Sequence, residues 1–223
     1  MVSRPILDGA RRNFVMKKAI FIPLFLTAVI FIVFPDATFA HSRGVITGTP
    51  NIYNVTLKKF EIRNTAGTWV VIKEGDQTFN IAAANAGAQL GSYASGNFPV
   101  GGYNRFRVTV SATFGIKGFV YDSGAGRTYY TTASASNSVA GNVGESSFGA
   151  DYDTYSFTLT SMEGAPAGDS LADGKITHEE EDAFTITAGQ DFERTLYVDV
   201  TGTLQLQPDH ILYPGPFTVD DTP

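Results

Sequence analysis

The sequence predicts an all-β protein in which a single antiparallel β-sandwich or jelly-roll domain follows a cleaved leader. Three observations support this fold class. Short segments rich in Val, Ile, Phe, Tyr and Thr recur after residue 50, several with alternating apolar and polar residues. Twenty-three glycines and ten prolines supply frequent turns. Almost no stretch of the predicted domain repeats its apolar residues at the helical period.

Two segments give the clearest strand predictions. In Arg105–Ser111, Phe106, Val108 and Val110 alternate with polar residues, which is typical of a half-buried strand. Asn54–Arg63 also alternates, but its apolar residues shift phase after Leu57, as a β-bulge requires. Further strands are predicted at Thr68–Lys73, Thr78–Ile81, Lys117–Tyr121, Thr128–Thr132, Tyr155–Thr160, Phe184–Thr187, Thr195–Val200, Thr203–Gln207 and Phe217–Val219. Loops are predicted at the small-residue tracts Ala82–Asn97 and Ala133–Gly149.

The first 40 residues have the pattern of a secretory signal peptide. Lys17 and Lys18 precede the apolar run Ala19–Phe34, and a small-residue exit ends at Ala40. The run has 16 residues, fewer than the roughly 20 that span a membrane. We therefore predict cleavage after Ala40 and a secreted domain over residues 41–223 with no membrane span; the alternative is an uncleaved anchor. The preceding stretch Met1–Val15 is charged and without periodicity, which makes Met16 a candidate true start of the chain.

Charge and cysteine content limit the partners of the secreted domain. From His41 onward there are 11 basic and 20 acidic residues, a net charge of −9, which argues against nucleic acid as a partner. The acids gather late in the chain, since the net charge is +5 up to Gly144 and −14 from Glu145 onward. The chain has no cysteine, so its core, a metal or partner subunits must stabilise it without disulfides.

Several segments together resemble bacterial secreted β-sandwich domains of the transthyretin-like kind. The resemblance is carried by TLKKFEIR, TWVVIK, GGYNRFRV, AFTITAGQDF and a proline-rich end. It covers about two thirds of the predicted domain. Many such domains have no known function, so the resemblance implies a sandwich fold and little about activity.

One acidic segment, Asp169–Glu180, resembles a calcium loop of the EF-hand or dockerin kind. Asp169, Asp173, Thr177 and Glu180 match ligand positions 1, 5, 9 and 12, and Gly174 matches the sharp turn. Leu171 departs from the pattern, because an oxygen ligand is expected there. The sequence thus predicts a calcium site, with a solvated acidic loop as the alternative.

Other chemistry has weaker signals. An N-terminal His41 is a candidate copper ligand, with His178 or His210 as a second ligand. A sugar-stacking platform is a further candidate, formed by Trp69, Tyr103, Tyr129, Tyr130 and Tyr155. No nucleophile-elbow motif is present, and contiguous acids such as Glu179–Asp182 usually form a solvated face. We therefore predict no catalytic residues and no enzyme activity.

These observations favour an extracellular, non-enzymatic, calcium-modulated subunit of a cell-surface or matrix structure. The charge split suggests head-to-tail association of copies into a filament, and Ser42–Asn54 is a candidate strand for addition to a neighbouring copy. The alternative is a secreted ligand-binding module for a glycan or for copper.

Overall fold

A computed structural model describes residues 45–83, 98–134, 136–140, 148–162, 168–188, 197–215 and 217–220. The predicted leader, its cleavage site and His41 lie outside these residues. The fold is all-β, and every strand pairing in the described part of the chain is antiparallel. The predicted fold class is therefore confirmed.

The largest sheet has seven strands in the order β10-β11-β4-β2-β5-β9, and β3 also pairs with β2. Strand β2 is long enough to pair with β4 near its C-terminal end and with β5 near its N-terminal end. The strand bounds are β2 Ile52–Asn64, β3 Trp69–Asn80, β4 Gly101–Ser111, β5 Thr113–Lys117, β9 Tyr155–Thr158, β10 Asp169–Ala172 and β11 Lys175–Ile186.

Three smaller sheets complete the strand pairing. Their orders are β1-β13-β14, β6-β7-β8 and β12-β15. Their bounds are β1 Ile46–Gly48, β6 Phe119–Asp122, β7 Arg127–Thr131, β8 Ser136–Ala140, β12 Tyr197–Asp199, β13 Leu204–Leu206, β14 Leu212–Pro214 and β15 Thr218–Asp220, with short 3-10 turns η1 at Ile81–Ala83 and η3 at Gly149–Asp151.

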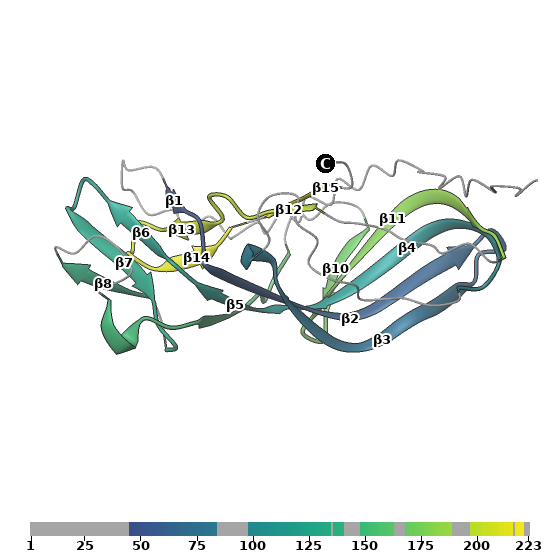
Figure 1. Ribbon diagram of the computed structural model, residues 1–223, viewed down its shortest axis with the longest axis horizontal. Helices are drawn as coiled ribbons and strands as arrows, with labels where there is room; N and C mark the ends of the chain where they lie inside the picture. The colour runs from purple at the N-terminus through teal and green to yellow at the C-terminus, as the bar shows by residue number, and fades with distance from the viewer. Residues whose placement is uncertain are drawn as a thin grey trace, which may run out of the picture.

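The elements form an elongated molecule (Figure 1). Strands β2, β3, β4 and β11 form a long twisted sheet at one end, whereas β1, β6, β7, β8, β13 and β14 gather at the other. Strand β2 runs from one group to the other, so it connects the two ends through a single continuous backbone.

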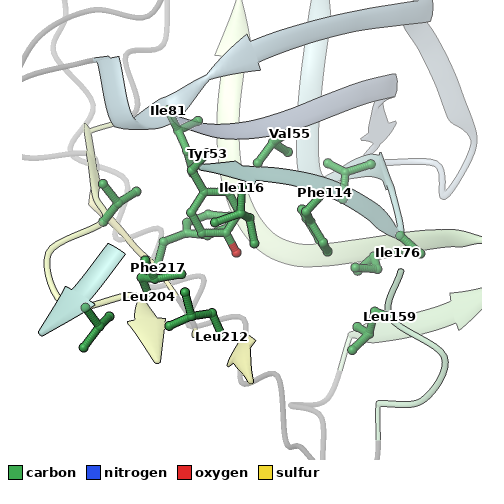
Figure 2. Close-up of a cluster of buried hydrophobic side chains, with 14 of the residues drawn as sticks. Tyr53, Val55, Ile81, Phe114, Ile116, Leu159, Ile176, Leu204, Leu212 and Phe217 are labelled. Atoms are coloured by element: carbon green, nitrogen blue, oxygen red, sulfur yellow. The ribbon is translucent and has the colours of Figure 1, made fainter. Parts of the chain in front are cut away.

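The main core lies where the first half of β2 meets the small sheets. Tyr53 is completely buried, and its ring makes edge contacts with Phe114 and Phe217. Its hydroxyl lies 3.4 Å from the carbonyl oxygen of Gly215, 162 positions along the chain. Figure 2 shows Tyr53 and Ile116 facing Leu204, Leu212 and Phe217. Residues from the early and late parts of the described chain therefore pack together in this main core.

The bulge predicted in β2 is confirmed. The register with both β3 and β4 shifts between Leu57 and Lys59. Because side chains alternate between faces of a strand, this extra residue puts Leu57 and Phe60 on the same face. That face continues along β4 through Val108, and it meets a second cluster of buried residues at the far end of the long sheet, formed by Ile62, Tyr103, Phe106, Phe184 and Ile186.

Several sequence predictions are corrected by the strand pairing. The predicted strands Thr68–Lys73 and Thr78–Ile81 are largely parts of one strand, β3, which spans Trp69–Asn80. Its register with β2 shifts at Ile72 and again around Gly75, so it loses clear alternation. The predicted loop Ala133–Gly149 contains β8, because small residues pair with β7 through their backbone. Within Ser42–Asn54, β1 pairs with β13 and the start of β2 pairs with β5. The described part of this segment, residues 45–54, therefore pairs within the chain's own sheets, whereas its addition to a neighbouring copy stays a prediction.

We expect Tyr53→Ala to lower the free energy of unfolding by about 3–5 kcal/mol, since it removes a buried aromatic ring from the main core. Tyr121→Ala is the matched control, because Tyr121 is 44% exposed, and it should cost less than about 1 kcal/mol. Urea unfolding of both variants at 25 °C measures the difference. Equal losses in the two variants would contradict the placement of this core.

Candidate functional site

The predicted calcium loop forms a β-hairpin. Strands β10 and β11 pair over Asp169–His178 to Ala172–Lys175, with Asp173 and Gly174 alone in the turn. Both turn residues have left-handed φ values, 52° and 67°. This is the conformation of a type I′ turn, which Asp-Gly favours because its twist matches the paired strands. The Asp173-Gly174 dipeptide therefore marks a hairpin turn and not the turn of a calcium loop.

The hairpin separates the four predicted calcium ligands. Asp169 lies beside His178, and Glu180 follows two positions later on the same side of β11. Thr177 alternates to the other side, and Asp173 is exposed at the turn. In the described segments, no three His, Asp or Glu side chains are grouped to hold a metal ion. The prediction that this segment forms a loop of the EF-hand or dockerin kind is therefore wrong, whereas calcium binding itself stays a prediction.

Two of the predicted ligands, Asp169 and Glu180, lie on either side of His178 and form a partly buried polar cluster with it. His178 Nδ1 lies 2.5 Å from Asp169 Oδ1, and His178 Nε2 lies 3.6 Å from Glu180 Oε2. The Asp169 side chain is only 1% exposed. Its second oxygen, Oδ2, has no hydrogen bond to any described residue. We call Asp169, His178 and Glu180 the hairpin cluster.

The hairpin cluster favours a charged imidazole. Burial disfavours the imidazolium and lowers the pKa of His178, but the hydrogen bond to Asp169 and the charges of Asp169 and Glu180 raise it. The hydrogen bonds and negative charges together outweigh burial, so the pKa of His178 lies above its ordinary value of 6.5. At mildly acidic pH the cluster therefore contains an imidazolium between two carboxylates.

A shallow, open hollow of about 540 Å³ lies beside β10. Its described lining comes from residues 158–162 and 169–174, and it includes Asp169 and the apolar side chains of Leu159 and Leu171. Because Leu159 belongs to the main core, the hollow ends against packed side chains.

The opposite face of the same sheet contains a ladder of alternating charges. Arg107 Nε donates a 2.8 Å hydrogen bond to Glu61 on β2, and Arg107 Nη1 lies 3.2 Å from Glu179 on β11. Arg105, the next residue on this face of β4, lies between Glu179 and Glu181. We call this set the charge ladder: Lys59, Glu61, Arg105, Arg107, Glu179 and Glu181.

Glu61 is the most buried member of the charge ladder, at 4% exposure. Burial raises the pKa of its carboxyl, but hydrogen bonds from Arg107 and Lys59 outweigh burial and hold that pKa below its ordinary value. The ring of Trp69 packs against the same guanidinium, with Arg107 Cζ 4.2 Å from the ring centroid. The carboxylate is therefore stabilised in its charged form.

The charge ladder corrects two sequence interpretations. Glu179 and Glu181 pair with arginines of β4, so the acid run is not simply a solvated face. These pairs also join acids from the late half of the chain to bases from the early half, so the charge split largely disappears in this part of the sheet. Sequence reasoning missed this network because the pairing of β4 with β11 cannot be read from either segment alone.

The candidate aromatic platform and histidine pair are also dispersed. Tyr103, Tyr129 and Tyr130 are buried and belong to three separate apolar clusters. The five rings therefore do not form one exposed surface. His210 stacks on Tyr129, with ring centroids 4.8 Å apart, whereas His178 belongs to the hairpin cluster. Copper binding through His41 lies outside the described residues and stays a prediction.

No known family model, curated protein or solved structure matches this chain. Among the described segments, no helix has the length and apolar character needed to cross a membrane.

We expect Arg107→Met to lower the free energy of unfolding by about 2–3 kcal/mol, because it leaves the buried Glu61 carboxylate without its main partner. Lys58→Met is the matched control, because it also removes a cation from the sheet, here from β2. Its partner, however, is Asp76, whose side chain is 67% exposed. The control should cost less than about 1 kcal/mol. Urea unfolding distinguishes them, and similar losses would contradict the structural role of Glu61.

The hairpin cluster should make stability depend on pH. Because the folded-state pKa of His178 is raised, its contribution to stability is complete below about pH 6.5 and is lost as the pH rises through the folded-state pKa. We expect the stability difference between the wild type and His178→Gln to shrink as the pH rises above about 6.5 and through the folded-state pKa of His178. Urea midpoints measure it, and a difference that stays constant over this range would contradict the prediction.

Proposed function

We propose that the protein is an extracellular, non-enzymatic structural subunit that associates with copies of itself at a cell surface or in a matrix. The leader pattern supports export, and the charge of the exported domain makes nucleic acid an unsuitable partner. The elongated all-β fold supports a structural role, because it offers long strand edges for association (Figure 1).

The observation that carries this proposal is the position of β3. This strand of 12 residues pairs with β2 on one side and with no other described strand. Figure 1 shows it at the margin of the long sheet. Val71, in its first half, is 47% exposed. An open strand edge presents unpaired backbone groups, which favour pairing with another chain.

Light scattering of the exported protein tests the proposal. We expect the apparent mass to exceed that of the monomer and to rise with protein concentration. A monomeric mass at all concentrations up to about 0.5 mM, a range that would detect weak association, contradicts the proposed function. Parallel samples with millimolar calcium or with chelator test the separate prediction that calcium binds this domain and modulates its assembly.

A further inference from the structure

Two polar atoms of the hairpin cluster are buried without a hydrogen bond. Asp169 Oδ2 and His178 Nε2 are shielded from solvent, and neither has a hydrogen bond to any described residue. The Asp169 side chain is only 1% exposed. Buried polar atoms in proteins normally have a partner, and an exception requires an explanation such as a bound ion. The cluster therefore has the unmet bonding capacity of a binding site.

The spacing of His178 and Glu180 is that of two ligands on one metal ion. The two residues stand two positions apart on β11, about 6.6 Å along the strand, yet His178 Nε2 lies 3.6 Å from Glu180 Oε2. This distance exceeds the roughly 2.7–2.9 Å of a charged hydrogen bond. Two atoms that each lie about 2.1 Å from a tetrahedral Zn²⁺ are about 3.4 Å apart. An ion between the two side chains therefore fits with little movement.

Asp169 fixes the orientation of the imidazole. His178 Nδ1 lies 2.5 Å from Asp169 Oδ1, so the neutral ring has its proton on Nδ1 and a lone pair on Nε2. A metal-ligating histidine almost always donates its other N–H in this way, often to a carboxylate. The ring also contacts Phe106, with ring centroids 6.4 Å apart. The side of the ring that faces Glu180 is therefore the side that can bind a metal.

The backbone holds Asp169 directly opposite His178 in the pairing of β10 with β11. One residue earlier, the carbonyl oxygen of Gly168 accepts a 3.0 Å hydrogen bond from Glu179 N. A Cβ at Gly168 would lie 2.5 Å from the carbonyl oxygen of Glu179, and its φ is 104°. Glycine thus permits the close approach of the two strands that brings Asp169 to the imidazole.

The donors and the charge of the hairpin cluster select a divalent transition-metal ion. Calcium takes oxygen ligands, whereas imidazole suits zinc and other transition metals. With a neutral imidazole, the carboxylates of Asp169 and Glu180 carry two negative charges, which one divalent ion balances. The side chains of His178 and Glu180 are 18% and 20% exposed, so water can reach the remaining coordination positions.

We propose that the hairpin cluster is a site for a divalent transition-metal ion such as Zn²⁺, bound by His178 Nε2 and Glu180 Oε2, with Asp169 as the positioning residue. The site has two protein ligands, in agreement with the absence of a group of three among the described residues, and water completes the coordination. It differs from the predicted calcium loop, which uses Asp173 and Thr177. It goes beyond the proposed function and does not depend on association between copies.

Zinc titration of the exported protein, followed by calorimetry, tests this site. His178→Gln and Glu180→Gln should each weaken binding at least tenfold. His210→Gln, which removes another imidazole, and Glu181→Gln, which removes the next acid on the opposite face, are the matched controls and should change binding less than twofold. Circular dichroism in chelator establishes that each variant folds. No binding by the wild type up to about 1 mM Zn²⁺, a range that detects weak sites, or equal binding by variants and controls, would overturn the assignment.

Nitrogen-15 NMR of the wild type identifies the ligating atom without any substitution. With Zn²⁺ bound, the ring of His178 should carry its proton on Nδ1 and the metal on Nε2. Asp169→Asn, which removes the charge at nearly constant size, should weaken binding by about tenfold to a hundredfold and leave Nε2 as the ligating atom. Metal on Nδ1, or unchanged affinity in Asp169→Asn, contradicts the roles assigned to the two residues.

Competition experiments separate this site from the other predicted metal sites. Because calcium does not use a nitrogen ligand, millimolar Ca²⁺ should leave the zinc bound. Displacement of zinc by calcium that binds His178→Gln equally well would show an oxygen-only site and overturn the role of His178. Zinc binding that is lost in His41→Gln but kept in His178→Gln would place the ion at the predicted N-terminal residue and overturn the proposal.

Discussion

The long sheet depends on one buried ion pair, Glu61 with Arg107. A carboxylate at 4% exposure is tolerated in a protein only where hydrogen bonds and opposite charges offset its lost hydration. Here Arg107 provides both, and Lys59 provides a second positive charge. Because the partners come from β2 and β4, any slip of one residue between these strands would move the carboxylate to the apolar face. The pair therefore fixes the register between β2 and β4, and the outer strands β3 and β11 pair with these two strands.

The two faces of the long sheet use charge in different ways. The charge ladder connects adjacent strands with alternating signs, so each charge has a neighbour of opposite sign. The hairpin cluster places a single histidine between two carboxylates on the otherwise apolar face, against Phe106. The first arrangement holds over a wide pH range, since it involves arginines and carboxylates. The second responds to pH near neutrality, because His178 can lose its proton.

Local sequence patterns predict features of single strands, but they do not predict contacts between distant segments. Alternation in Arg105–Ser111 and the phase shift after Leu57 are properties of single strands, and both predictions are confirmed. The acid run and the arginines of β4 were visible separately, but their pairing is a property of two segments about 70 positions apart, which no local pattern contains. Asp173-Gly174 satisfies both a calcium-loop pattern and a hairpin turn, and the pairing of residues 169–172 with 175–178 shows that it forms the hairpin turn.

The contact between Tyr53 and Gly215 has a consequence for the order of folding. Residues 162 positions apart must meet before the main core closes, and β1 must wait for β13. Closing so large a loop is entropically costly, and folds dominated by such pairings form slowly, in milliseconds to seconds. During synthesis, β2 emerges long before its core partners in β13 and β14. The chain therefore remains open until almost all of it is made, which is the condition that the proposed export through a translocation channel would require.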